Sequence, residues 1–199
     1  MAVLNNDGSG FRWLTSGANS NAFPSFAPDG GQIVFRTQGP EGQGLRILNL
    51  TDHSIRKLTD NWDNFPVWSP TGDRIAFVRR TGQDFQVLTI RPGGTTAKQL
   101  THGTGNNAHL AWSPDGSHLL FTDSAKGFKD EAQYTGSPQP YGEIFLMCAD
   151  GGGLEQLTDD QWEEGVPPGC PPRYRGGPLT GASGSREFAL LDLGHDGGA

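Results

Sequence analysis

The chain has 199 residues, 34% of them hydrophobic and 19% charged, which suffices for one or two globular domains. With 15 Lys and Arg against 22 Asp and Glu, it has a formal net charge of −7 and lacks the clustered cations of a nucleic-acid-binding surface. No apolar run reaches the roughly 18 residues of a membrane span, and the first residues show no secretory signal, so the sequence leaves the compartment open.

Residues 1–15 are predicted to form two short strands, joined by a turn at Asp7-Gly8 and closed by Leu14-Thr15. Asp and Gly favour such a reversal, because both tolerate positive φ angles. The same Asp-Gly turn and Leu-Thr ending recur, with equal spacing, at Asp150 and Leu157. This first segment is therefore interpreted as the outer half of a unit that appears whole further along.

Residues 16–59 hold the first whole unit, which opens with the phrase FPSFAPDG at residues 23–30. The Pro-Asp-Gly in this phrase predicts a hairpin between a first strand and an apolar second strand ending at Phe35. A third strand over Arg46–Leu50 is followed by a fourth that ends at Leu58. Alternating apolar residues bounded by Gly, Pro and Asp favour strands throughout.

Residues 60–101 and 102–158 repeat this unit. The opening phrase returns as FPVWSPTG at residues 65–72 and as HLAWSPDG at residues 109–116, so that its proline recurs after 42 and then 44 residues. The apolar run closed by Phe and the Leu-Thr ending also recur, but the third unit carries 13 additional residues. This insertion lies within residues 123–142.

Residues 159–172 are predicted to begin a further unit, because a first strand over 165–171 stands at the expected distance after the preceding Leu-Thr pair. The segment departs from the repeat, since Gly169 occupies the place of Trp or Phe. Residues 173–199 lose the pattern altogether. Two interpretations stay open for them: an irregular or disordered tail, or the product of a truncated or altered reading frame.

Four short strands in about 42 residues are typical of a β-propeller blade. The predicted fold class is all-β: a β-propeller of four-stranded antiparallel blades over residues 1–172, with about three full blades and a partial blade at each end. The phrase SPDG before an apolar strand, a DGG turn and QLT resembles the repeats of the TolB-like (WD40-like) β-propeller family over about residues 1–171. Less specifically, the blades are similar to the non-catalytic propeller domain of prolyl-oligopeptidase-type serine peptidases.

Closed propellers have about four to eight blades, which leaves two architectures for this number of repeats. In one, the N-terminal half-blade pairs with residues 165–171 and the tail to complete a fourth blade and close a small ring. In the other, the propeller is incomplete and open, and its terminal blades expose strand edges and apolar faces that invite self-association. The open propeller is the architecture predicted here.

One face of a propeller collects the connections between blades and the loops between second and third strands. This face is predicted to carry residues 60–64, 102–107 and 159–164 and the insertion at 123–142. Its aromatic, cationic and amide side chains are the candidate partner-binding residues: Trp62, His102, Asn106, Lys126, Phe128, Lys129, Tyr134, Tyr141 and Trp162. Aromatic anchors suit a protein or peptide partner, and the alternative is a surface insertion without a partner.

No catalytic, metal or cofactor site is predicted. The sequence contains no G-x-S-x-G elbow and no glycine-rich phosphate loop, and its acidic connections lack the spacing of a calcium loop. The aspartates Asp29, Asp115 and Asp150 are assigned to turn geometry. The TolB-like resemblance implies a non-enzymatic module that binds a protein or peptide through the insertion-bearing face. The alternative is a fragment of a serine-peptidase propeller domain without its catalytic domain.

Overall fold

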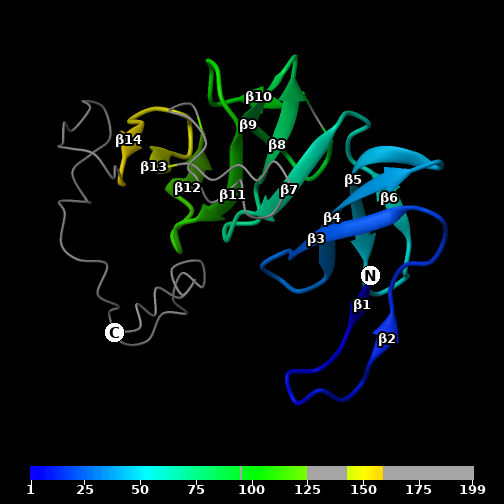
Figure 1. The fold of residues 1–199 in the computed structure, drawn as a ribbon. Coiled ribbons are helices and arrows are strands. Elements are labelled where there is room, and N and C mark those ends of the chain that lie inside the picture. The colour runs from blue at the N-terminus through cyan, green and yellow to red at the C-terminus, as the bar shows by residue number, and fades with distance from the viewer. Residues whose placement is uncertain (95, 125–142, 159–199) are drawn as a thin grey trace, which may run out of the picture. The chain divides into compact units, whose positions relative to one another are not determined.

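The computed structural model describes residues 1–94, 96–124 and 143–158, all of which belong to one compact unit, Met1–Gly169. Every described element is a β-strand, and the strands form three four-stranded antiparallel sheets and one two-stranded sheet (Figure 1). The all-β fold class is therefore confirmed. No described segment is a helix of the length and apolar character that a membrane crossing needs.

The first full blade, named blade 1, follows a short two-stranded sheet, named the half-blade. The half-blade consists of β1 (Ala2–Val3) and β2 (Arg12–Trp13). Blade 1 consists of β3 (Ser20–Phe26), β4 (Gln32–Gly39), β5 (Gly42–Asn49) and β6 (Ile55–Lys57). Its strands pair in chain order, as a propeller blade requires.

Blades 2 and 3 have the same order of strands. Blade 2 consists of β7 (Asp63–Trp68), β8 (Ile75–Thr81), β9 (Asp84–Ile90) and β10 (Lys98–Gln99). Blade 3 consists of β11 (Asn107–Trp112), β12 (His118–Asp123), β13 (Glu143–Cys148) and β14 (Glu155–Gln156). The predicted insertion at residues 123–142 begins at the last residue of β12, and all of it except Asp123 and Ser124 lies outside the described residues.

Each blade packs against the next through the alternating faces of its strands. Strand β7 contacts β3, β4 and β5 of blade 1, and β11 contacts β7, β8 and β9 of blade 2. Blade 2 places Phe77 and Leu88 in the cluster shared with blade 1, and Val78 and Val87 in the cluster shared with blade 3. Phe77 and Leu88 lie on the face that is turned to the preceding blade, which we call the leading face. Val78 and Val87 lie on the face that is turned to the following blade, which we call the trailing face.

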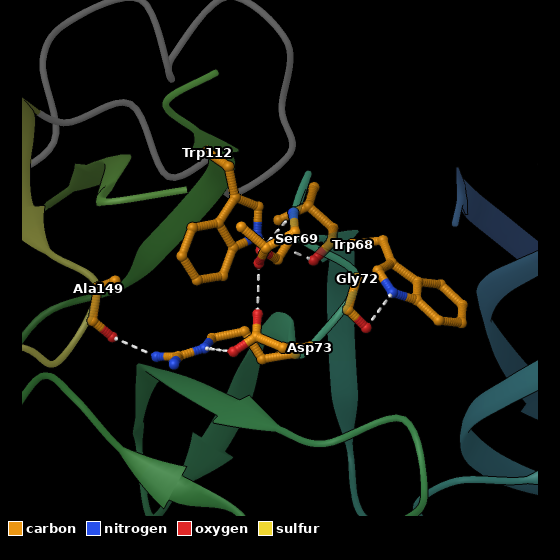
Figure 2. Close-up of polar contacts among 9 residues, drawn as sticks. Trp68, Ser69, Gly72, Asp73, Trp112 and Ala149 are labelled. Carbon is orange, nitrogen blue, oxygen red and sulfur yellow. Dashed lines mark hydrogen bonds and ion pairs between the residues drawn. The ribbon is translucent and has the colours of Figure 1, made fainter. Parts of the chain in front are cut away.

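The blades are also joined by polar contacts at their repeated Trp positions (Figure 2). The Trp112 Nε1–H donates to the Val67 carbonyl oxygen of blade 2 at 3.2 Å, and an Arg74 guanidinium N–H donates to the Ala149 carbonyl oxygen of blade 3 at 3.3 Å. In blade 2 the Trp68 Nε1–H donates to the Gly72 carbonyl oxygen at 3.3 Å. Trp112 thus joins two neighbouring sheets, and Trp68 stabilises the turn of its own blade.

The recurring Leu-Thr pair has a physical explanation in the structure. The hydroxyl oxygens of Thr59, Thr101 and Thr158 each accept a hydrogen bond from the backbone N–H that lies fourteen residues earlier in the third strand, at 2.9, 2.8 and 2.9 Å. The threonine therefore continues the ladder where the short fourth strand has ended. The neighbouring Leu58 and Leu100 are buried in the clusters between blades.

The turn aspartates have the role that the sequence predicts. Asp29 and Asp150 each accept a hydrogen bond at 2.9 Å from the backbone N–H two residues later. Asp115 accepts from the Ser113 and Ser117 hydroxyls and from the Ser117 N–H, and these bonds lower the pKa of its carboxyl well below its usual value. These carboxylates stabilise turns, and the turn assignment is confirmed.

Candidate functional site

The start of the inner strand of blade 2 forms a cluster of aromatic and charged side chains on the predicted face. Trp62 precedes β7 and is exposed, and its carbonyl oxygen accepts a hydrogen bond from the Arg80 N–H at 3.1 Å. The Arg80 guanidinium lies over the indole ring, 5.3 Å from its centroid, and its Nε–H donates to the Gly82 carbonyl oxygen. Trp62 and Arg80 therefore present an aromatic ring and a cation together.

An ion pair with a buried carboxylate anchors the same strand end. Asp63 accepts two hydrogen bonds from Arg79, at 2.7 Å from Nε and 2.8 Å from the terminal nitrogen, and the Asp63 side chain is fully buried. The Arg79 guanidinium also lies over the Phe77 ring at 5.3 Å. The hydrogen bonds to the carboxylate raise the pKa of Arg79. This bidentate pair fixes the backbone that carries Trp62.

The other described candidates differ in exposure. His102 is exposed, and its Nδ1 lies 3.3 Å from the Gln99 amide nitrogen. Asn106 is half-buried, and its backbone exchanges hydrogen bonds with Ser124, accepting from the Ser124 N–H at 3.1 Å and donating to the Ser124 hydroxyl at 3.0 Å. Asn106 thus holds the end of β12 beside the connection from blade 2 to blade 3. Of these two candidates, His102 is the more accessible to a partner.

The remaining candidates lie outside the described residues. They are Lys126, Phe128, Lys129, Tyr134, Tyr141 and Trp162.

A row of rings across the inner strands escaped the sequence interpretation. Phe23, Phe65 and His109 occupy the same repeat position, with φ angles of 54°, 48° and 52°, at the irregular step of each inner strand. The Phe23 and Phe65 ring centroids lie 4.5 Å apart, and those of Phe65 and His109 lie 5.2 Å apart. The only sequence signal was the recurrence of a ring at the first residue of the FPSFAPDG-type phrase.

This row of rings ends in a cation and contains an imidazole. The Arg36 guanidinium lies over the Phe23 ring, 5.3 Å from the centroid. His109 is exposed, yet partial burial of its imidazole against neighbouring side chains lowers its pKa, because it penalises the charged form. Non-glycine residues at positive φ are uncommon and cluster at functional sites, so the row belongs with the candidate site.

One Ser–His contact resembles catalytic machinery but has the wrong arrangement. Ser117 Oγ lies 2.7 Å from His118 Nδ1 and 2.6 Å from the Asp115 carboxylate, to which it donates its only hydroxyl hydrogen. A nucleophile needs the opposite order, with the serine donating to the imidazole and the carboxylate orienting that imidazole. In the part of the chain that the structure describes, no three His, Cys, Asp or Glu side chains are grouped to hold a metal ion.

The chain is similar to TolB proteins in sequence. No protein-family model matches it. It is 32% identical over 122 residues to a Protein TolB homolog of Chlorobium luteolum. The aligned region covers 61% of this chain and 28% of that protein. It is 29% identical over 110 residues to Dipeptidyl-peptidase 5 of Porphyromonas endodontalis, covering 51% of this chain and 16% of that one. The chain thus spans less than a third of the length of these relatives.

Solved structures show the same fold. A putative TolB from Agrobacterium tumefaciens superposes with a TM-score of 0.69 at 20% identity, covering 79% of this chain and 55% of that one. TolB from Acinetobacter baumannii gives a TM-score of 0.65 at 16% identity, covering 80% and 37%. The β-propeller domain of the Trilobed protease from Pyrococcus furiosus, described as having an open velcro topology, gives 0.51 at 12% identity, covering 79% and 48%. These likenesses confirm the β-propeller fold, of which the described residues hold three full blades and a half-blade.

Proposed function

We propose that this chain, which belongs to the TolB-like β-propeller family, is a non-enzymatic interaction module that binds a protein or peptide. The binding face is the one that carries Trp62, His102 and the insertion at residues 123–142. The exposed Trp62–Arg80 pair, next in sequence to the Asp63–Arg79 ion pair, is the observation that carries this proposal. A rigid aromatic ring beside a cation is the kind of anchor on which partner binding depends most.

The names of similar proteins support this proposal. Several similar proteins are named Tol-Pal system protein TolB, including one from Thioalkalivibrio sulfidiphilus that is 38% identical over 73 residues. A propeller that belongs to a multi-protein system suits an interaction role, whereas the fold by itself assigns no partner.

Selection of phage-displayed peptides on the purified chain tests the proposal. Peptides that bind are then titrated by calorimetry against the unaltered chain, Trp62→Ala and a deletion of residues 126–140. Trp62→Ala is expected to weaken binding by at least about tenfold, as at other aromatic anchors. Phe26→Ala is the matched control, because Phe26 is also an exposed aromatic residue but lies at the end of β3, whereas Trp62 precedes the start of β7. Equal affinities for all variants would refute the assignment of this face.

The second candidate function is a propeller domain that accompanies a serine peptidase, as the similarity to Dipeptidyl-peptidase 5 suggests. The observation in its favour is that solved peptidase-related chains share the fold, among them a puromycin hydrolase at a TM-score of 0.54. Transcript sequencing across the gene distinguishes the two. A reading frame that continues into a G-x-S-x-G segment supports the peptidase, and its absence supports the independent module.

A further inference from the structure

The trailing face of blade 3 is apolar and less covered than the same face of blades 1 and 2. Leu157 is 41% exposed, although its repeat equivalents Leu58 and Leu100 are 8% and 7% exposed. The same contrast holds along the sheet, where Ile144 and Leu146 of β13 are only half-buried. Blades 1 and 2 show what such a face is built to contact, which is the leading face of another blade.

The half-blade offers a leading face of this type. In blade 3, Phe145 and Met147 lie on the leading face, and Gln156 pairs with Phe145. In the half-blade, Trp13 pairs with Ala2, the repeat equivalent of Phe145, and Leu4 is the equivalent of Met147. Trp13 and Leu4 therefore occupy leading-face positions. Leu4, Phe11 and Trp13 are 54%, 59% and 72% exposed. The Phe11 and Trp13 rings meet edge to face at 5.4 Å. Burial of such a patch contributes roughly 25 cal/mol per Å² of apolar area, which drives association.

We propose that two copies of this chain associate head to tail, with the half-blade of each copy seated on the trailing face of blade 3 of the other. The matched part of this chain spans 55% of the solved chain of a putative TolB from Agrobacterium tumefaciens, so two copies together hold about the repeat length of one such propeller. Two copies together hold six full blades and two half-blades, which falls in the range of closed propellers. Two identical head-to-tail junctions close such a dimer.

Charge at the junction makes this contact weaker than the contacts inside the chain. Arg56 of blade 1 donates to the Pro92 carbonyl oxygen of blade 2 at 2.7 Å, and Lys98 of blade 2 donates to the Asp150 carbonyl oxygen of blade 3 at 2.8 Å. Blade 3 carries Glu155 at this repeat position, and the half-blade carries Asp7 at the position of Asp150. The junction between copies therefore lacks a hydrogen bond and brings two carboxylates near each other, so the dimer dissociates on dilution.

Sedimentation velocity over a wide range of concentrations tests the proposal with the full 199-residue chain. The unaltered chain is expected to change from a 21.3 kDa monomer to a dimer of twice that mass as its concentration rises. Leu157→Glu and Trp13→Glu are each expected to abolish the dimer. Glu155→Lys is expected to tighten it severalfold, because it restores the missing donor opposite Asp7. Leu154→Glu, at an exposed position equivalent to the leading-face residue Ala97, is the matched control and leaves the dimer unchanged.

Mixing two variants distinguishes head-to-tail contact from other dimers. A Leu157→Glu copy keeps an intact half-blade and a Trp13→Glu copy keeps an intact blade 3, so their mixture retains one sound junction and is expected to associate when neither variant does alone. Urea unfolding of each variant, followed by circular dichroism, shows that the monomers are folded. A chain that stays monomeric at every concentration overturns the proposal. Association that survives both substitutions, or a mixture that stays monomeric, overturns it too.

Discussion

His109 is a titratable group placed where the two preceding blades have phenylalanine. It shares the positive φ of Phe23 and Phe65, and its ring lies against Phe65. Because burial lowers the pKa of its imidazole, the unfolded chain binds more protons than the folded chain as the pH falls through the usual histidine range near 6.5. The stability that neutral His109 contributes is therefore present at higher pH and is lost on acidification.

Replacement of His109 by Phe tests this pH dependence. Between about pH 7.5 and pH 5.5, above the carboxylate range, the free energy of unfolding of the unaltered chain is expected to fall. His109→Phe is expected to show a smaller fall, because the equivalent Phe23 and Phe65 already fit this backbone position. Urea unfolding at a series of pH values measures both slopes. Equal slopes for the two proteins would show that His109 is not the group responsible.

Gly44 is a position where the fold allows no side chain. Its φ is 102°, and an added Cβ would lie 2.5 Å from the Thr59 carbonyl oxygen and 3.0 Å from the Asp60 Cα atom. Gly82 also has a positive φ, 68°, but a Cβ there would meet open space. Gly82→Ala is expected to cost about 1–2 kcal/mol from backbone strain alone. Gly44→Ala is expected to cost about 1–3 kcal/mol more, because backbone atoms must move.

Chemical denaturation of the two glycine variants checks this difference. The comparison cancels the common cost of an L-residue at positive φ and isolates the clash with the Leu-Thr segment. If Gly44→Ala proved no less stable than Gly82→Ala, the close approach of β5 to Thr59 would not exist in solution.

At the scale of the element, the closing threonine completes each blade, and its burial determines its energetic weight. Thr101 is buried and accepts from the Val87 N–H while donating to the Gln86 amide oxygen at 2.8 Å. Thr158 accepts the same bond from the Ile144 N–H and donates to the Glu143 carboxylate at 2.6 Å, but Thr158 itself is exposed. A buried N–H that loses its partner pays its full desolvation cost, whereas an exposed one finds water.

Thr101→Val is expected to reduce the free energy of unfolding by about 1–3 kcal/mol. Thr158→Val, at the same repeat position, is expected to cost less than Thr101→Val, because water reaches the exposed position and replaces the hydroxyl as partner of the Ile144 N–H, although the Glu143 carboxylate also loses a donor. Urea unfolding gives both values, and amide exchange at Val87 and Ile144 reports the two bonds directly. Similar losses for both variants would mean that the exposed threonine is covered in solution.

The elements themselves were largely predictable, because each blade repeats the same local signals. The Pro-Asp-Gly turns, the apolar second strands and the Leu-Thr endings lie where the repeat places them. The third strand of blade 1 begins earlier than expected, at Gly42 instead of Arg46, because a tight turn pairs Gly39 with Gly42 and extends the ladder. The glycine-rich sequence at residues 42–45 does not predict this extension of the strand, because its hydrogen bonds depend on pairing with β4.

The candidate site was less predictable than the blades. Trp62 and His102 were placed by counting loops, but the Asp63–Arg79 pair joins residues sixteen positions apart whose meeting depends on strand register. The positive φ at Phe23 and Phe65 arises from an irregular step in the ladder, which an alternating pattern does not reveal. Pairing in three dimensions, and not local propensity, decides these features.

At the scale of the molecule, neighbouring blades are coupled by large side chains at one repeat position. Trp68 is 9% exposed in the cluster shared by blades 1 and 2, while Phe26, its equivalent in blade 1, is 54% exposed. In a protein built of stacked repeats, each unit is stabilised mainly by its neighbours. Trp68 therefore couples the sheets of blades 1 and 2, and Phe26 contributes little to the coupling of its blade with a neighbour.

Trp68→Ala is expected to lower the free energy of unfolding by about 3–5 kcal/mol, as for other buried aromatic truncations, and to separate the unfolding of blade 1 from that of blades 2 and 3. Phe26→Ala is expected to cost less than about 1 kcal/mol and to leave unfolding cooperative, because little apolar contact is lost. Urea curves followed by circular dichroism and by tryptophan fluorescence coincide when unfolding is two-state. Coincident curves for Trp68→Ala would show that blades 1 and 2 remain coupled without this side chain, and the polar bridges between them would then carry the cooperativity.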